Sequence, residues 1–214
     1  LSAIYKTPNI CKIGNAAKRA MVTNPKNTIS FVKRLMGADF NDENVKKMQK
    51  LATYDIVNKS GKPYVKIDDK EYSPEQISSM IVGKMKKVAE DYIGEEIKDA
   101  VITVPAWFGD AARTATKTAG ELAGLNVLRV INEPTSAALA ANLMEDKKDK
   151  TVVVVDSGTG TVDVSVLELS DGMAEVLASN GDVYLGGKDY DDAIVKWVVD
   201  EFKKSDDVDL TKDN

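Results

Sequence analysis

The stretch that decides the fold is VVVVDSGTGTVDVS, residues 152–165. Four valines lead into Asp156, a turn rich in glycine and threonine follows, and valine alternates with polar residues again from Val162. This pattern predicts two strands joined by a tight turn. A plain hairpin needs no carboxylate at the mouth of its turn. A phosphate-binding loop that handles a metal does, so both interpretations stay open at this point.

Composition narrows the classes of function. The chain has 214 residues, 43% of them apolar, which is enough for one large domain or two small ones. A net charge of −5 without a basic stripe argues against a nucleic-acid partner. The absence of histidine excludes Ser-His-Asp and Cys-His catalysis. Cys11 is the one cysteine, which favours a reducing, cytoplasmic-type compartment, and no apolar run is long enough to cross a membrane.

Hydrophobic periodicity and capping residues predict an alternation of strands and helices. The helix over 74–93 has the strongest start, because Ser73 is an N-cap, Pro74 takes the first helical position and Gln76 completes a capping box. The other expected elements are a strand region in 1–13, a short helix at 15–22, a helix over 28–36 closed by Gly37, a solvated helix or loop at 41–50, a hairpin around Ser60-Gly61, strands at 100–104 and 127–131, helices over 109–123 and 134–143, strands at 151–155, 161–169 and 173–179, and a helix over 189–204.

The order of these elements predicts an α/β fold with mixed sheets and flanking helices. Strands and helices alternate through 95–145, and antiparallel hairpins follow. The charged segment 145–150 is the expected linker, so we place a domain boundary near 144–150.

The glycine loop carries the first candidate chemistry. Gly158 and Gly160 allow a close approach of backbone amides to phosphate oxygens, and Thr159 and Thr161 add hydroxyl donors. It is not a dinucleotide-binding fingerprint, because a third glycine is absent and a strand follows instead of a helix. From the loop alone, an ordinary hairpin turn is an equally good interpretation.

Further candidates lie around this loop. Asp156 and Asp163 form a carboxylate pair suited to Mg²⁺, although two polar residues at strand ends are the commoner explanation. Gly186-Gly187 lacks the lysine of a Walker A motif but precedes a helix whose N-terminus could receive phosphates. Glu133 lies at a strand-to-helix junction, where an acid is also favoured by the helix dipole.

Read together, several stretches resemble the seventy-kilodalton heat-shock chaperones, in particular the bacterial DnaK-type proteins. The stretches are IGNAAKRAMVTNPKNTI (13–29), VKRLMG (32–37), AVITVPAWFGDAARTATKTAGELAGL (100–125), VINEPTSAALA (130–140), VVDSGTGTVDVSVLEL (154–169) and VLASNGDVYLGGKDYD (176–191). They cover nearly the whole chain in one consistent order, and the combination of their motifs is highly specific.

The resemblance implies an actin/hexokinase-like ATPase fold, two lobes around a nucleotide cleft, with an incomplete second lobe here. By this resemblance, residues 1–72 are the outer part of the first lobe and 73–146 its inner part. Residues 147–185 are the first half of the inner second lobe, and 186–214 begin the outer second lobe.

The resemblance also assigns roles to individual residues. Lys18 resembles the catalytic lysine that stabilises the γ-phosphate and positions water. Glu133 resembles an acid on the water shell of Mg²⁺, and Asp156 the aspartate that orients water on the metal side. Thr161 resembles the threonine near the γ-phosphate, and Asp163 a carboxylate of the metal network. The expected catalytic set is therefore Lys18, Glu133, Asp156 and Thr161.

The remaining site residues follow the same resemblance. Gly158, Thr159, Gly160, Gly186 and Gly187 are the expected nucleotide-binding residues. The ligands implied are ATP or ADP with Mg²⁺, held by Asp156, Asp163 and Glu133 mostly through water, with K⁺ as a further ion that the resemblance allows. Phosphoryl transfer of this kind depends on positioning and charge neutralisation, which carboxylates and a lysine supply without histidine.

Two further residues resemble a regulatory relay of the family. Pro105 resembles a proline proposed as an allosteric switch, and Arg113 lies on its relay.

The chain also departs from the family pattern. Thr159 replaces a glycine of the phosphate loop, Trp107 and Gly109 replace a tyrosine and an asparagine-like residue, and Lys188 replaces an acid. The family's first phosphate loop and its adenosine-binding segment are not in this sequence. We therefore expect the chain alone to bind Mg-ATP weakly or not at all.

The favoured hypothesis is part of the ATPase domain of a DnaK-type chaperone in which Mg-ATP hydrolysis drives client folding. Its implied partners are unfolded client peptides bound through another domain, J-domain co-chaperones and nucleotide-exchange co-chaperones, in the cytoplasm or an organelle matrix. The alternative is a non-catalytic remnant of the fold that acts as a protein interaction module. A third hypothesis, a relative of actin-like filaments or sugar kinases, shares the fold but lacks the INEPT and LGGxDxD motifs.

Overall fold

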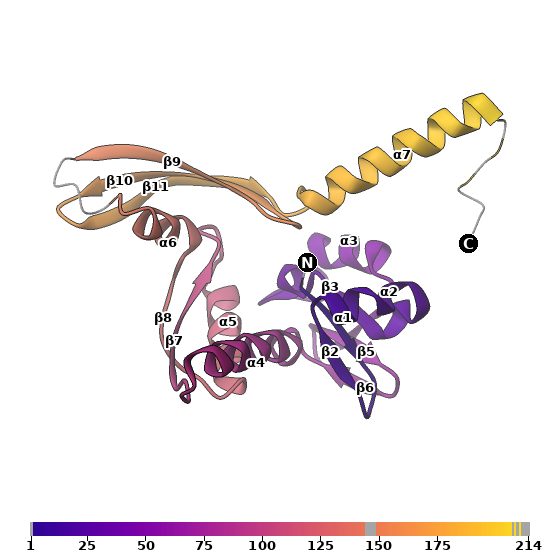
Figure 1. Cartoon of the computed structure of the whole chain (residues 1–214), viewed down its shortest axis with the longest axis horizontal. Helices are drawn as coiled ribbons and strands as arrows, with labels where there is room; N and C mark the ends of the chain where they lie inside the picture. Colours follow the sequence, from indigo (N-terminus) through magenta and orange to yellow (C-terminus); the bar gives the residue numbers. More distant parts are fainter. Residues whose placement is uncertain (1, 144–148, 207, 209, 211–214) are drawn as a thin grey trace. The chain divides into compact units, whose positions relative to one another are not determined.

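The computed structural model of the protein describes residues 2–143, 149–206, 208 and 210 (Figure 1). The chain divides into two compact units, Leu1–Ala141 and Asn142–Asn214. The boundary lies a few residues before the one expected from the sequence. Most of the charged segment 145–150 lies outside the described residues. Among the described helices, none is long and apolar enough to cross a membrane.

The first unit contains three small sheets with helices between them. One is antiparallel with the order β2-β1-β3, the second is antiparallel with the order β4-β5-β6, and the third is the parallel pair β7-β8. Its elements are β1 (Ala3–Lys6), β2 (Cys11–Ile13), α1 (Asn15–Lys18), α2 (Ala20–Thr23), η1 (Pro25–Asn27), β3 (Thr28–Ser30), η2 (Val32–Leu35), α3 (Glu43–Leu51), β4 (Asp55–Lys59), β5 (Lys62–Ile67), β6 (Lys70–Tyr72), α4 (Pro74–Ile93), β7 (Asp99–Val104), α5 (Asp110–Leu122), β8 (Asn126–Asn132) and α6 (Glu133–Ala140), where η marks a 3-10 helix.

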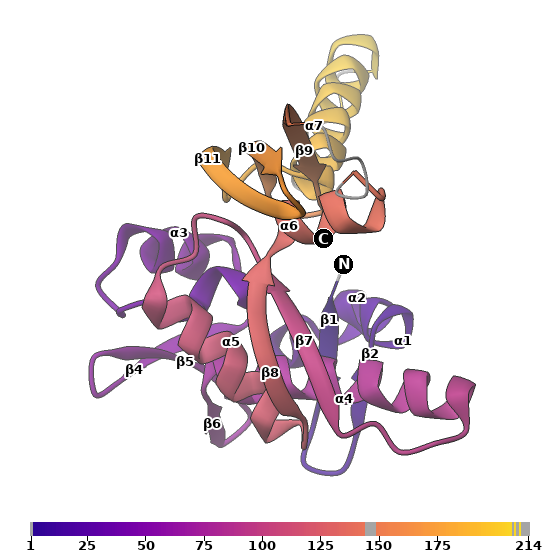
Figure 2. The ribbon, with the colours of Figure 1, turned by 90° about the vertical axis from the view of Figure 1, so that its left-hand side faces the viewer.

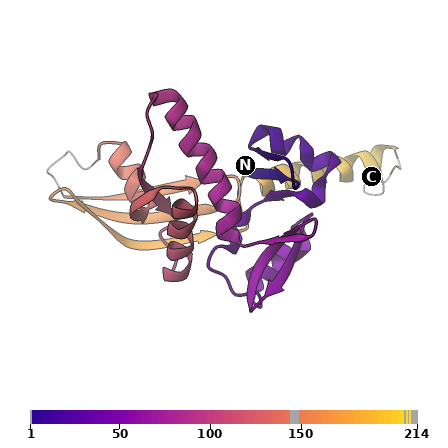
Figure 3. The same ribbon diagram turned by 90° about the horizontal axis from the view of Figure 1, so that it is seen from below.

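The longest helix of this unit begins and ends as its sequence predicts. The Gln76 amide donates to Ser73 Oγ at 3.3 Å, and the Ser73 amide donates to Gln76 Oε1 at 2.9 Å, so the capping box is complete. Gly94 ends the helix in the left-handed conformation at φ 81°. The β4–β6 sheet lies beside the N-terminal end of α4 (Figure 3).

The expected helix over 28–36 is wrong. Residues 28–30 form β3, a fully buried strand that pairs with β1. The buried Thr28 hydroxyl donates to the Asn24 carbonyl at 2.8 Å, which satisfies it inside the strand. Phe31 then takes the left-handed conformation at φ 58°, and only a short 3-10 helix follows. The helical spacing of apolar residues arose because a strand and a 3-10 helix both contribute to the core.

Two other elements differ from expectation at their ends. The helix expected to reach Leu143 ends at Ala140, because Asn142 has a φ of 55° that a right-handed helix excludes. The last helix starts at Gly187 instead of 189 and runs to Asp206. Strand β6 was missed by the sequence prediction, since three residues are too few to show a hydrophobic alternation.

The core of the β7-β8 region forms where helix α5 covers the parallel strands (Figure 2). Its buried cluster joins η2, β7 and α5 and consists of Met36, Val104, Phe108, Ala115 and Ala119. The helix packs closely because Gly120 has no side chain: a Cβ there would lie 2.6 Å from Ile102 Cδ1 and Val127 Cγ2. This packing fixes the ends of β7 and β8, which Pro105 and Glu133 follow directly.

The second unit is an antiparallel sheet with the order β11-β10-β9, followed by one helix. Its elements are β9 (Lys150–Ser157), β10 (Val162–Ser170), β11 (Met173–Asp182) and α7 (Gly187–Asp206). Asp171 and Gly172 both have positive φ, 50° and 75°, which suits the tight turn between β10 and β11. Alternate residues of β10 are buried on one face: Asp163, Ser165, Leu167 and Leu169.

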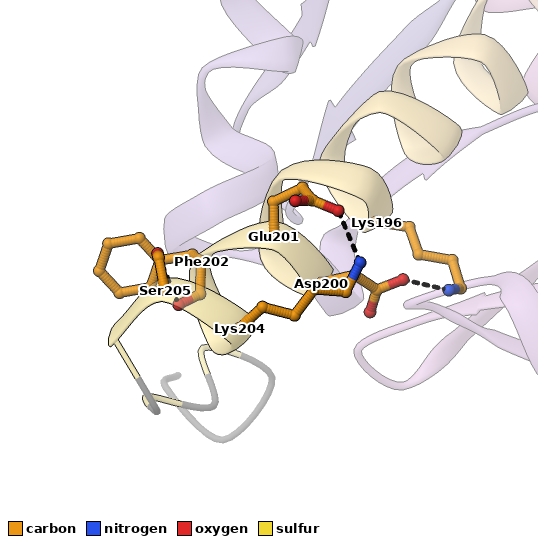
Figure 4. Close-up of polar contacts among 6 residues, drawn as sticks. All are labelled: Lys196, Asp200, Glu201, Phe202, Lys204 and Ser205. Atoms are coloured by element: carbon orange, nitrogen blue, oxygen red, sulfur yellow. Dashed lines mark hydrogen bonds and ion pairs between the residues drawn. The ribbon is translucent and has the colours of Figure 1, made fainter.

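Helix α7 carries ion pairs along its own surface. Lys196 contacts Asp200 at 2.6 Å, and Lys204 contacts Glu201 at 2.7 Å (Figure 4). The hydrogen bond from Lys196 lowers the pKa of Asp200, and the hydrogen bond to Glu201 raises the pKa of Lys204. The contribution of the Asp200 pair is therefore present at neutral pH and is lost as acid protonates the carboxylate. These exposed pairs support the helix locally and are screened by salt.

We predict that Gly37→Ala destabilises the first unit by about 2–4 kcal/mol. Gly37 has a φ of 68°, and a Cβ there would lie 2.4 Å from the Ala112 backbone nitrogen, so η2 and α5 would have to separate. Urea unfolding followed by circular dichroism measures the change.

Gly61→Ala is the matched control for this substitution. Gly61 has a φ of 82° but no atom within 4 Å of its Cβ position, so it carries the backbone cost alone, about 1 kcal/mol. Equal losses for the two variants would show that the close approach of Gly37 to α5 is unimportant.

Candidate functional site

The glycine loop of residues 158–161 is joined to the start of α7 through backbone hydrogen bonds. The Gly158 amide donates to the Thr161 carbonyl at 2.9 Å and closes the turn. The Gly187 amide donates to the Gly158 carbonyl, and the Lys188 amide donates to the Thr159 carbonyl, each at 3.0 Å. The two glycine motifs that the sequence singled out are therefore one structural element.

Gly186 makes this junction possible. It is buried, and a Cβ there would lie 2.6 Å from the Gly160 nitrogen and 2.7 Å from the Thr159 carbonyl carbon. Because these are backbone atoms on both sides, no side chain could move away to make room. Gly187 is less constrained, since its Cβ position is 3.6 Å from Thr159 Cα.

This geometry gives the double glycine a bracing function. The amides of Gly187 and Lys188, which open α7, both donate to carbonyls of the loop. The phosphate-binding role expected for the start of α7 stays a prediction. What the structure shows is that the helix start holds the 158–161 loop in place.

Two carboxylates lie at the base of the same loop. Asp156 on β9 and Asp163 on β10 are directly opposite one another in the antiparallel pair. A carboxylate oxygen of each lies within 4.8 Å of the other. Asp163 is 5% exposed, and Asp156 is exposed. Like charges that face one another across strands repel, so a cation between them would be stabilising.

Asp163 is further constrained from the neighbouring strand β11. Gly181 is its cross-strand partner, and a Cβ on that glycine would lie 2.5 Å from Asp163 Oδ1. A glycine is therefore needed at 181 for the carboxylate to keep its place. Sequence reasoning missed this residue, because its importance depends on the β10-β11 register. The pair of hard oxygen donors fits Mg²⁺, which prefers carboxylate and water ligands.

In the first unit, Arg113 of α5 connects the ends of the two parallel strands. Its Nε donates to the Phe108 carbonyl at 2.7 Å, and its Nη2 donates to the Ala106 carbonyl at 3.3 Å. The same Nη2 donates to Asn132 Oδ1 at 2.6 Å, at the end of β8. Pro105 is fully buried at the start of the turn that Arg113 holds. Arg113 thus connects the segment after Pro105 to the residue before Glu133.

Glu133 begins α6 and forms an ion pair that the sequence did not predict. The Lys33 ammonium donates to Glu133 Oε1 at 2.9 Å. Lys33 lies in the VKRLMG stretch, but nothing in that stretch distinguishes it from the many other lysines of the chain. Lys18 is the last residue of α1 and is exposed. Lys18 and Glu133 belong to the first unit, and Asp156, Thr161 and Asp163 belong to the second.

The structure gives defined contacts to two of the residues that depart from the family pattern, Trp107 and Lys188. The ring of Trp107 meets that of Phe108 edge to face, with 4.9 Å between centroids, so the replacement packs against the core cluster. Lys188 pairs with Asp192 one turn further along α7 at 2.6 Å, which compensates its charge near the helix start.

The fold and the site define a mixed α/β protein with a braced glycine loop and a carboxylate pair, a combination suited to nucleotide phosphates and a divalent cation. A family model described as Hsp70 protein matches residues 2–214. The chain therefore belongs to the Hsp70 family of chaperones.

Membership in this family confirms the expected actin/hexokinase-like ATPase fold and the class of chaperone nucleotide-binding domains. The family implies ATPase activity in the full-length protein, with binding of ATP or ADP and Mg²⁺. It also implies client peptides and co-chaperones in general.

We predict that Gly186→Ala opens the junction between the loop and α7. The added Cβ must displace the Thr159–Gly160 peptide, which breaks the hydrogen bonds from the Gly187 and Lys188 amides. Hydrogen exchange of these two amides should become at least about tenfold faster.

Gly187→Ala is the control, because its Cβ position has only ordinary contacts with Thr159. The Lys188 amide should exchange at the wild-type rate in this variant. Unchanged exchange in Gly186→Ala would contradict the bracing function of the double glycine.

Proposed function

We propose that this chain is part of the ATPase domain of a bacterial DnaK-type chaperone and that residues 156–163 bind the phosphates and Mg²⁺ of ATP. The observation that supports the proposal most strongly is the braced loop with two carboxylates at its base. An ordinary hairpin turn requires neither a buried aspartate nor a helix start held against its tip.

Each residue of the proposed site has a task. Asp156 orients the attacking water, and Asp163 holds the metal network from its buried position at the β10-β11 register. Thr161 lies beside the γ-phosphate, and Lys18 stabilises its charge. Glu133 binds the metal's water shell. Bound Mg²⁺ would neutralise phosphate charge, which is the main requirement of phosphoryl transfer.

The loop itself contributes rigidity. Gly158 and Gly160 allow the backbone of the loop to pass close to the phosphates, and Thr159 adds a hydroxyl donor, while Gly186 and Gly187 keep the loop from relaxing. Thr159 is compatible with this role because its φ is not positive, so its side chain causes no backbone strain. A loop held in place before the ligand arrives loses little entropy on binding.

The proposal extends to the organisation and partners of the protein. Residues 1–72 and 73–146 are the outer and inner parts of the first lobe, and 147–185 and 186–214 belong to the second. Hydrolysis drives client folding together with J-domain and nucleotide-exchange co-chaperones, and Pro105 with Arg113 relays the nucleotide state. K⁺ is a further ion of the site, and the cytoplasm or an organelle matrix is the proposed location.

We predict weak, site-specific binding of Mg-ATP by this chain, with a Kd on the order of 1 mM. A ¹⁵N-edited NMR titration should shift the amide signals of Thr159, Thr161 and Gly187. Asp156→Asn should weaken binding at least about tenfold, because it removes a charged ligand from the metal side of the site.

Asp171→Asn is the matched control, since Asp171 lies in the turn at the other end of β10 and Asn tolerates its φ of 50°. It should bind Mg-ATP like the wild type. A folded chain whose loop signals do not move at millimolar Mg-ATP would contradict the proposal and favour the interaction-module alternative.

A further inference from the structure

The Lys33–Glu133 ion pair contributes little to the free energy of unfolding, but it orients the Glu133 carboxylate. The side chains of Lys33 and Glu133 are 48% and 20% exposed, and a pair this open contributes at most about 1 kcal/mol to folding. The two residues lie one hundred positions apart in sequence, and the pair joins η2 to the first turn of α6. Its main effect is to restrict the rotamers of a carboxylate that would otherwise be free to move.

The segment that presents Lys33 is fixed at both ends. Phe31 before it is left-handed, and the Arg34 guanidinium stacks over the Phe31 ring at 4.7 Å. Leu35 is fully buried, Met36 belongs to the core cluster, and Gly37 lies against the backbone of α5. Lys33 therefore extends from a backbone segment, residues 31–37, that is held by packing on both sides of it.

Lys33 also lies near the aromatic ring of Phe108. The Lys33 ammonium lies 6.0 Å from the centre of the Phe108 ring, at the limit of a cation–π contact. Phe108 is itself held by Arg113 through its carbonyl. Lys33 is thus placed by the same core that holds the turn after Pro105.

The backbone of Glu133 is positioned separately. Asn132 before it accepts a hydrogen bond from Arg113 at 2.6 Å, and Pro134 after it is buried. The Ser136 hydroxyl donates to the Glu133 carbonyl at 3.0 Å. Arg113 therefore helps to fix the position of the Glu133 backbone, through the residue before it, and Lys33 fixes the direction of the Glu133 carboxylate.

The pair leaves one carboxylate oxygen available. Lys33 contacts Oε1, and within the described part of the chain no hydrogen bond or ion pair occupies Oε2 of Glu133. A carboxylate held through one oxygen by a cation presents the other oxygen in a defined direction, which a ligand or a metal-bound water requires.

We propose that Lys33 is a positioning residue for Glu133: it fixes the direction of the Glu133 carboxylate and thereby sets the rate of hydrolysis. The proposal rests on the proposed function, in which Glu133 binds the metal's water shell. Lys33 itself touches neither substrate nor reacting atoms. A misdirected Glu133 should slow hydrolysis while nucleotide affinity, which depends on many contacts, stays nearly the same.

The test has a nucleotide-free arm on this chain. In a ¹H–¹⁵N spectrum of lysine ammonium groups, an ordered and hydrogen-bonded Lys33 should give a persistent signal that Glu133→Gln abolishes. Lys62→Met provides a matched control: Lys62 forms a surface pair with Asp39 at 2.6 Å, and its removal should leave the Lys33 signal unchanged.

The second arm measures single-turnover ATP hydrolysis by the protein in its full natural length. Lys33→Met should lower the rate about tenfold with a Kd for Mg-ATP within about twofold of wild type. Lys33→Arg, which keeps a cation on the same backbone segment, should recover most of the rate. Lys62→Met should hydrolyse ATP like the wild type, and all variants should melt within a few degrees of one another.

The outcomes separate the two proposals. A wild-type rate in Lys33→Met, or a Lys33 signal that survives Glu133→Gln, would overturn the positioning role. A loss of rate matched by an equal loss of thermal stability would also overturn it, as a folding effect. A wild-type protein that neither binds nor hydrolyses Mg-ATP would overturn the proposed function, while the ammonium spectrum would still decide whether Lys33 orders Glu133.

Discussion

The contact of Gly186 with the Thr159–Gly160 peptide is the constraint on which the candidate site depends. It brings backbone against backbone at a distance that a methyl group would prevent. Two strand ends, a turn and a helix start become one rigid element because of it. The carboxylates of Asp156 and Asp163 lie at the base of this element and inherit its rigidity. A loop of the same sequence without that support would be an ordinary hairpin turn.

The parts of the fold that the sequence predicted are those encoded within a few residues. The helix from Pro74 to Ile93 was predicted because its capping box and its terminal glycine lie inside the segment. The strands around the glycine loop were predicted because valine-rich segments with strand propensity flank it on both sides, although next to the loop the buried residues of β10 are Asp163 and Ser165 and not the valines. The segment around Phe31 was not, because its strand is defined by pairing with β1 and its left-handed turn by the core beyond it. Local pattern and tertiary context disagreed there, and context determined the structure.

The candidate site divides in the same way. Asp156 and Asp163 could be paired from sequence, since a tight turn places their strands side by side. The resemblance to Hsp70 supplied the roles of Lys18 and Glu133, which spacing alone could not. Lys33 escaped notice because its partner is one hundred residues away and its type is common on surfaces. The hydrogen bonds from the first α7 amides to the loop carbonyls could not be predicted from the sequence either, because they depend on the path of the chain between β11 and α7.

The two tryptophans of the chain fall one in each compact unit. Trp107 packs edge to face on Phe108, in the turn whose Phe108 carbonyl accepts a hydrogen bond from Arg113, and it is 40% exposed. Trp197 lies on α7 and is 64% exposed. The chain therefore contains one tryptophan fluorophore in each unit. If one tryptophan is replaced by phenylalanine, the fluorescence of the remaining tryptophan reports on the unfolding of its own unit alone. No attached label is needed.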